Sequence, residues 1–165
     1  MKPFKQSGYS LLELLIYIAL FTFLSVVLVQ SLITVMKTYA QAQSYRALQN
    51  NGELAMERIT RELRNGSTAS TSACVATPGT LSIASSDASG DTHTTVFGVN
   101  TGRVQLTIDG ASPSDITTDE VAVSSLTFCR FTTPVGSAVK AVLVLTTTKG
   151  VIVSAPFYTT IVLRD

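Results

Sequence analysis

The chain has 165 residues, about the size of one ordinary domain, and its 12 basic and 11 acidic residues leave a formal charge of +1. This balance, without a basic stripe, argues against a nucleic-acid-binding protein. The 45% hydrophobic content is ordinary, but these residues gather in one block near the N-terminus and in a strand-like C-terminal half. The part outside the block therefore has enough apolar material for one modest core.

The first feature along the chain is an uncharged apolar segment. From Leu14 to Met36 no side chain carries a formal charge, and these 23 residues can cross a hydrocarbon core of about 30 Å as an α-helix. Lys2 and Lys5 precede the segment, so the positive-inside tendency keeps the first residues in the cytoplasm and exports the rest. A cleaved secretory signal fits poorly, because the block is too long and no small-x-small site follows it. A generic single-span anchor fits the length but leaves the acid at its edge, Glu13, unexplained.

A short motif surrounds that acid. After a short basic leader, the run Gly8-Tyr9-Ser10-Leu11-Leu12-Glu13 resembles the prepilin peptidase site of type IV pilins and type II secretion pseudopilins. The resemblance implies cleavage after Gly8, N-methylation of Tyr9 as the mature N-terminus, and Glu13 as the fifth mature residue. Tyr9 departs from the phenylalanine most often seen there but keeps an aromatic ring.

The resemblance also implies a role for Glu13 in assembly. In the family, the glutamate of an incoming subunit is thought to meet the N-terminus of its filament neighbour. An ammonium and a carboxylate are each costly in low dielectric, and pairing reduces both costs. The alternative is that Glu13 sits at the membrane interface in water.

The pattern predicts that the helix continues past the membrane, from about Tyr9 to Arg64, over roughly 80–85 Å. One face is expected to be apolar: Tyr45, Leu48, Gly52, Ala55, Ile59 and Leu63. Two i, i+4 ion pairs are expected on the polar side: Glu57 with Arg61 and Arg58 with Glu62. Asn65-Gly66 is a plausible stop, because glycine can take the left-handed conformation there. The charged run from Glu53 to Arg64 is interpreted as a solvated helix face, with subunit contacts as the alternative.

Strands are expected in the rest of the chain. Residues 65–95 have the Ser, Thr, Ala and Gly content of exposed loops around one short strand. The predicted strands are Thr80–Ala84, Thr94–Val99, Arg103–Ile108, Val121–Thr132, Ala141–Thr148, Val151–Ser154 and Phe157–Leu163. Lys149-Gly150 is a hairpin candidate, and Pro156 should break the ladder or mark its edge.

The fold class that follows is α+β and, by resemblance, pilin-like, with one long helix packed on a C-terminal antiparallel β-sheet. Its parts are a leader (residues 1–8), a transmembrane and polymerisation half of the helix (9–36), an extracytoplasmic amphipathic half (37–65) and a β-rich head (66–165). A weaker resemblance to minor subunits of the W or J type rests on Ile59–Arg64, Leu126–Phe128 and Val162–Arg164.

Reactive groups are sparse. Cys74 and Cys129 can form one disulfide if this half of the chain reaches an oxidising compartment, or remain two small buried thiols. His93 is the only histidine and has no metal-ligand cluster around it in the sequence. The aspartates lack EF-hand-like spacing, so they are interpreted as turn and surface residues rather than a calcium site. We therefore expect no enzyme, no cofactor and no bound metal.

The resulting functional hypothesis is a minor pilin or pseudopilin, held by one span in the cytoplasmic membrane with its head outside until it joins a filament. The expected partners are other pilin or pseudopilin subunits, the prepilin peptidase, an inner-membrane assembly platform and membrane lipid, with no direct nucleic-acid contact. The alternative is a membrane-anchored extracytoplasmic binding domain that does not polymerise. Glu13 discriminates between the two, because only polymerisation needs an acid to pair with a neighbour's N-terminus.

Overall fold

The computed structural model describes residues 10–71, 74, 78–86, 89–133 and 136–163. Two compact units divide the chain, Met1–Ala40 and Gln41–Asp165. The first holds the N-terminal half of the helix. The second holds the C-terminal half of the helix and all the strands.

Helix α1 runs from Leu11 to Asn65 without a break. At its start the Ser10 carbonyl accepts hydrogen bonds from the amides of Glu13 (2.9 Å) and Leu14 (3.3 Å). At its end the Gly66 amide donates to the Glu62 carbonyl (2.9 Å), so the predicted stop is confirmed. The predicted reason for the stop is wrong, because Gly66 does not adopt a positive φ. A side chain at this position would instead collide with the Ile83 side chain, so glycine is needed for the close approach.

The buried face of α1 lies wholly in the second unit. Its members are Ser44, Leu48, Asn51, Gly52, Ala55, Met56, Ile59 and Leu63. The predicted face is confirmed except for Tyr45, which is 45% exposed. Ser44 is buried instead, where a β-carbon on Gly150 would lie 3.1 Å from its hydroxyl. The backbone comes so close at this point that a small side chain is favoured over an aromatic ring.

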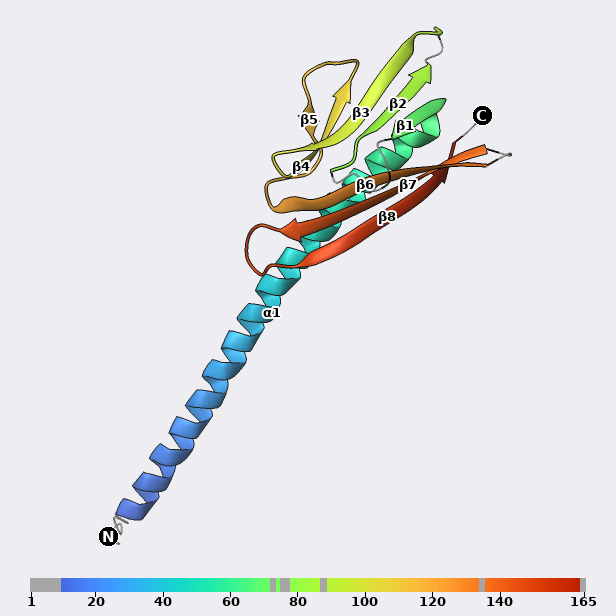
Figure 1. The fold of residues 1–165 in the computed structure, drawn as a ribbon. Helices are drawn as coiled ribbons and strands as arrows, with labels where there is room; N and C mark the ends of the chain where they lie inside the picture. The colour runs from blue at the N-terminus through green and yellow to red at the C-terminus, as the bar shows by residue number, and fades with distance from the viewer. Residues whose placement is uncertain (1–9, 72–73, 75–77, 87–88, 134–135, 164–165) are drawn as a thin grey trace, which may run out of the picture. The chain divides into compact units, whose positions relative to one another are not determined.

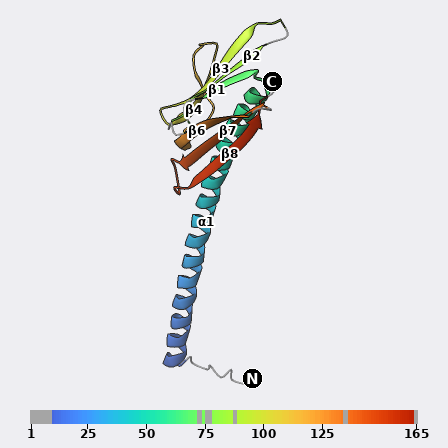
Figure 2. The same cartoon turned by 45° about the vertical axis from the view of Figure 1, so that its right-hand side comes forward.

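The strands form two antiparallel sheets, which Figures 1 and 2 show against the C-terminal half of α1. The first sheet has the order β1-β2-β3-β4-β5, so each strand pairs with its neighbours in sequence. Its strands are β1 Thr68–Thr71, β2 Leu81–Ser86, β3 Thr92–Asn100, β4 Arg103–Ile108 and β5 Ser114–Asp115. The second sheet has the order β6-β7-β8, with β6 Val121–Thr133, β7 Gly136–Thr147 and β8 Ser154–Val162.

This architecture confirms the predicted α+β class, with two sheets where one was expected. β4 has the predicted bounds, and β2, β3, β6 and β7 differ at their ends. β1 and β5 were not predicted, because one is rich in Ser, Thr and Ala and the other has two residues. Both are strands only through pairing with β2 and β4.

The segment after β7 corrects a prediction. Residues 151–153 do not form a strand. The Thr147 hydroxyl donates to the Val151 carbonyl (2.8 Å) and accepts from the Val153 amide (2.9 Å), which folds this segment into a turn. β8 then begins at Ser154 and continues through Pro156, opposite Val144. A proline is tolerated there because β8 is an outer strand that pairs only with β7.

One hydrophobic core joins the helix to both sheets. The helix supplies Leu48, Ala55, Ile59 and Leu63, each fully buried. The first sheet supplies Leu81, Ile83, Phe97 and Val104, and the second Leu126, Phe128, Leu143 and Leu145. The head therefore holds the C-terminal half of α1 as part of its own core. The apolar residues in the N-terminal half of α1 are not part of this core.

Candidate functional site

The apolar half of α1 contains a segment of membrane-spanning character. It includes a strongly apolar stretch of 18 residues, none of which is buried against any other part of the described chain. Large apolar side chains are exposed along it, for example Leu12 (69%), Phe21 (71%) and Phe23 (71%). A helix that is apolar on all sides belongs in lipid or against other helices. This half of α1 is therefore long enough and apolar enough to span a membrane.

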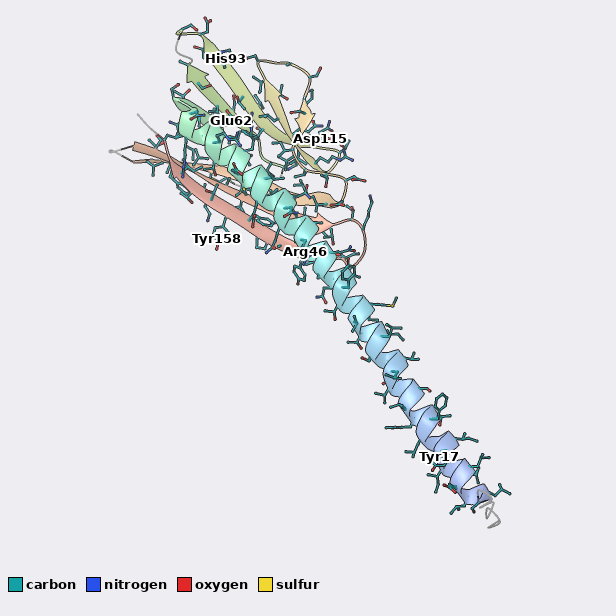
Figure 3. All side chains as sticks on the ribbon, turned by 180° about the vertical axis from the view of Figure 1, so that it is seen from behind. Tyr17, Arg46, Glu62, His93, Asp115 and Tyr158 are labelled. Carbon is teal, nitrogen blue, oxygen red and sulfur yellow. The ribbon has the colours of Figure 1, made fainter. Side chains whose placement is uncertain are left out.

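Glu13 lies in the first turn of this helix. An acid in the first turn is favoured by the unpaired amides there and by the positive end of the helix dipole. The pattern Ser10-x-x-Glu13 matches a capping box, in which the glutamate turns back to the amide of the cap residue. The carboxylate instead accepts a hydrogen bond from the Tyr17 hydroxyl, with 3.2 Å between Oη and Oε1. Tyr17 is labelled on α1 in Figure 3.

Three other hydroxyls of this half of α1 bond to the main chain instead. Thr22 donates to the Ala19 carbonyl (2.9 Å), Ser25 to Phe21 (2.8 Å), and Thr34 to Gln30 (2.9 Å). Such bonds to the preceding turn let Ser and Thr reside in lipid. Tyr17 is too long to reach its own backbone in this way. Its side-chain partner was not predicted, although the i, i+4 spacing of Glu13 and Tyr17 was a readable signal.

The two processing residues, Gly8 and Tyr9, lie outside the described residues. Cleavage after Gly8 and methylation of Tyr9 therefore stay predictions. So does the role of Glu13 in assembly, although its place at the start of an exposed apolar helix is compatible with that role.

The two cysteines come together from distant parts of the chain. The Cys129 sulfur lies 3.7 Å from the Cys74 carbonyl oxygen. Neither cysteine forms a disulfide in this structure. The hydrogen bond with Cys74, with burial as the second cause, raises the pKa of the Cys129 thiol. The predicted disulfide stays a prediction, now with both partners in the same place.

The remaining candidates in the head are surface pairs. His93 Nδ1 lies 2.7 Å from Asp109 Oδ2, and Asp109 Oδ1 accepts from the Thr94 amide (2.6 Å). The hydrogen bond from His93 is the main cause that lowers the pKa of Asp109. Asp115 accepts from Arg103 (2.8 Å), in keeping with its interpretation as a surface residue. Among the described residues, no group of three or more His, Cys, Asp and Glu is placed to hold a metal ion.

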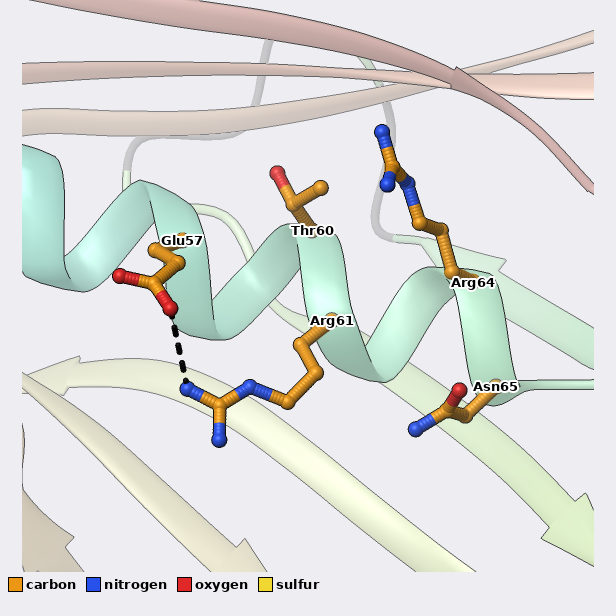
Figure 4. A pocket seen from close by; sticks show the side chains of 5 residues that line it. All are labelled: Glu57, Thr60, Arg61, Arg64 and Asn65. Atoms are coloured by element: carbon orange, nitrogen blue, oxygen red, sulfur yellow. Dashed lines mark hydrogen bonds and ion pairs between the residues drawn. The ribbon is translucent and has the colours of Figure 1, made fainter.

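A shallow hollow of about 240 Å³ lies along the last turns of α1 and is shown in Figure 4. Its lining is Glu57, Thr60, Arg61, Arg64 and Asn65. The predicted ion pair between Arg61 and Glu57 is confirmed at 3.3 Å, and that between Arg58 and Glu62 at 3.1 Å. The hollow is open and is lined by side chains on the surface of the helix.

Comparison with known protein families gives a match at the N-terminus. Residues 3–29 match the model described as the prokaryotic N-terminal methylation motif, a range that includes Gly8, Tyr9 and Glu13. No curated protein and no solved structure matches the chain. The motif and the apolar helix together support a processed, single-pass, membrane-anchored subunit of the type IV pilin-like class. The motif points to a structural protein rather than an enzyme.

Proposed function

We propose that the chain is a minor subunit of a type IV pilus or of a type II secretion pseudopilus, incorporated into an extracytoplasmic filament or at its tip. The observation that carries this proposal is the methylation motif over residues 3–29, which overlaps the exposed apolar start of a long helix. Within that helix up to Met36, Glu13 is the one acid. A carboxylate in this setting is costly unless a partner compensates it.

The proposed cycle begins in the cytoplasmic membrane. The basic leader with Lys2 and Lys5 stays on the cytoplasmic side and the head is exported. A prepilin peptidase cuts after Gly8, and Tyr9 becomes the methylated N-terminus. The new ammonium and the Glu13 carboxylate of adjacent subunits then pair on the assembly platform, because pairing reduces the cost of both charges in low dielectric.

The head fits the role of a folded domain that the filament carries on its outside. Its core is closed by the C-terminal half of α1, so the head needs nothing from the apolar half for its own burial. The W or J type is proposed on the segments Ile59–Arg64, Leu126–Phe128 and Val162–Arg164. The described parts of these segments lie at the end of α1, in the middle of β6 and at the end of β8, and Arg164 lies outside the described residues.

Intact-mass analysis of the membrane-extracted chain, with and without a co-expressed prepilin peptidase, tests the processing step. The expected product lacks residues 1–8 and carries one methyl group on Tyr9. A Gly8→Asp variant is the matched control and should keep the full-length mass with the peptidase present. A wild-type chain that stays uncut beside an active peptidase would overturn the proposal and favour the non-polymerising membrane-anchored domain.

Assembly is tested separately with Glu13→Gln, which removes the charge but keeps the shape of the side chain. The variant should be cut normally and should be reduced in sheared filaments relative to the membrane pool. If Glu13→Gln enters filaments as well as wild type does, pairing with the N-terminus is not what selects the subunit.

A further inference from the structure

The hydrogen bond between Tyr17 and Glu13 differs in kind from four other hydroxyl bonds in the apolar half of α1. Thr22, Ser25, Thr34 and Thr38 donate to main-chain carbonyls three or four residues earlier. Tyr17 donates to a side chain, and that side chain is the segment's acid. Because helical side chains tilt toward the N-terminus, a residue at i+4 lies back over residue i, which places the phenol above the carboxylate.

We propose that Tyr17 is a positioning residue for Glu13, holding its carboxylate in one orientation within the membrane until a neighbour's N-terminus binds it. This inference rests on the proposed function, since it assigns a role within the same assembly step. It gives a role to a residue outside the run from Gly8 to Glu13. It also gives the stored subunit a means of keeping an acid in lipid before a neighbour arrives.

The geometry of the Glu13 carboxylate lets Tyr17 orient it without blocking a neighbour's N-terminus. Tyr17 occupies Oε1, and among the described residues no hydrogen bond or ion pair to Oε2 is found. One oxygen therefore remains for an incoming ammonium while the other is already fixed. At 3.2 Å the bond is long for an O–H···O contact, so it restrains the carboxylate without competing strongly with a full positive charge.

The orientation of the carboxylate matters for access. If Glu13 formed the capping box, its carboxylate would turn back to the Ser10 amide and be engaged with its own helix start. The bond to Tyr17 draws it along the helix toward the next turn instead. Glu13 is only partly exposed in this structure, so the orientation of its carboxylate decides whether a neighbour's N-terminus can reach it.

Tyr17→Phe tests the inference, because it removes the hydroxyl and keeps the ring. Thr22→Val and Ser25→Ala are matched controls that remove a hydroxyl from the same helix without touching Glu13. Each variant is made in the full-length chain, alone and combined with Glu13→Gln. The fraction recovered in sheared filaments is measured beside the intact mass of the membrane pool.

Tyr17→Phe should be cut normally and should lower filament incorporation by about threefold to tenfold, the range expected for the net contribution of one typical hydrogen bond. It should have no further effect in the Glu13→Gln background, and the two controls should match wild type. Equal loss in both backgrounds would show that Tyr17 acts through packing, and no loss at all would remove its role. Either result overturns the inference.

A second readout does not depend on filaments. The infrared spectrum of the detergent-solubilised chain with ¹³C-labelled glutamate reports on the carboxylate directly. The carboxylate band that Glu13→Gln removes should shift in Tyr17→Phe and stay unchanged in Thr22→Val. An unshifted band overturns the contact itself. A shifted band in a chain that is neither cut nor incorporated overturns the proposed function, and the assembly role of Tyr17 with it.

Discussion

The ring of Phe157, on β8, lies directly over Gly52 of α1. A β-carbon built on Gly52 would overlap three atoms of that ring, so only glycine lets the strand approach the helix so closely. Gly52 is buried and Phe157 is half-buried. A glycine in mid-helix costs about 1 kcal/mol relative to alanine, and the close packing of the ring is what compensates here.

Gly52→Ala should therefore destabilise the head, although the same change stabilises an ordinary helix. Overpacking costs about 1–3 kcal/mol, which exceeds the gain in helix propensity. Thermal unfolding of the full chain in detergent, followed by the β-sheet signal, measures the loss. Glu53→Ala, at the exposed neighbouring position, is the control.

The partner supplies a second test of the same contact. In a Phe157→Leu background the Gly52→Ala change should cost less than in wild type, because the smaller side chain leaves room for the methyl group. A Gly52→Ala variant with a raised unfolding temperature would show that the ring yields easily and that the glycine has another cause.

The buried amide of Asn51 carries the second prediction. Asn51 is 4% exposed, accepts a hydrogen bond from the Thr118 amide (2.8 Å) and donates to the Ala47 carbonyl (2.8 Å). Asn51→Ala removes both bonds, and a typical intramolecular hydrogen bond contributes about 0.5–1.5 kcal/mol net. The adjacent Asn50 is exposed, so Asn50→Ala is a control of identical chemistry. Equal unfolding midpoints for the two variants would contradict the bridging role.

The long helix could be predicted because its signals are local. An uncharged run followed by apolar residues at spacings of three and four specifies a helix whatever it packs against. The same reasoning put Tyr45 on the buried face, because spacing alone cannot show that Gly150 approaches at Ser44. Such close contacts depend on the tertiary fold, and the spacing of apolar residues in the sequence does not predict them.

The sheets show the same boundary between local and non-local information. The hairpin of β3 and β4 could be read from two strand-like runs around a glycine turn. The division into two sheets could not be predicted, because the alternation of apolar and polar residues along a strand does not show which strand it pairs with. At the candidate site, Glu13 was found from its charge, but its bond to Tyr17 needed the direction of the side chains as well as their spacing.

The cysteine pair leads to a third prediction. Cys129 and Cys74 are adjacent in space, so we expect a disulfide once the head is in an oxidising compartment. Both thiols then lose their hydrogens and pass two electrons to a thiol–disulfide oxidoreductase or another disulfide of that compartment. Closing a loop of this length should stabilise the head by up to about 4 kcal/mol in the chain-entropy model.

Alkylation of the exported protein before and after reduction measures the bond. The unreduced chain should take no alkyl group and the reduced chain two, and Cys129→Ser should leave one reactive thiol under both conditions. Two alkylated cysteines in the exported, unreduced chain would show that the pair functions as free thiols.

The fourth prediction concerns pH and the pair formed by Asp119 and Lys149, whose charged atoms are 2.7 Å apart. The hydrogen bond from Lys149 lowers the pKa of Asp119, and the same bond raises the pKa of Lys149. A lowered carboxyl pKa contributes stability that is present above the unfolded value, near 3.8, and is lost as pH falls through the folded value. A raised ammonium pKa contributes stability below the unfolded value, near 10.5, that is lost as pH rises through the folded value.

The pair should therefore add stability on a plateau between about pH 4 and pH 10 and lose it at both ends. Asp119→Asn should lower the unfolding temperature at pH 7, flatten the acid limb of the profile, and leave less difference from wild type at pH 2. The effect should be small and should shrink in high salt, because both side chains are largely exposed. Lys149→Met should have the same effect, and the double variant should add little to either. If the two single losses add in full, each residue is stabilising the head through some other contact.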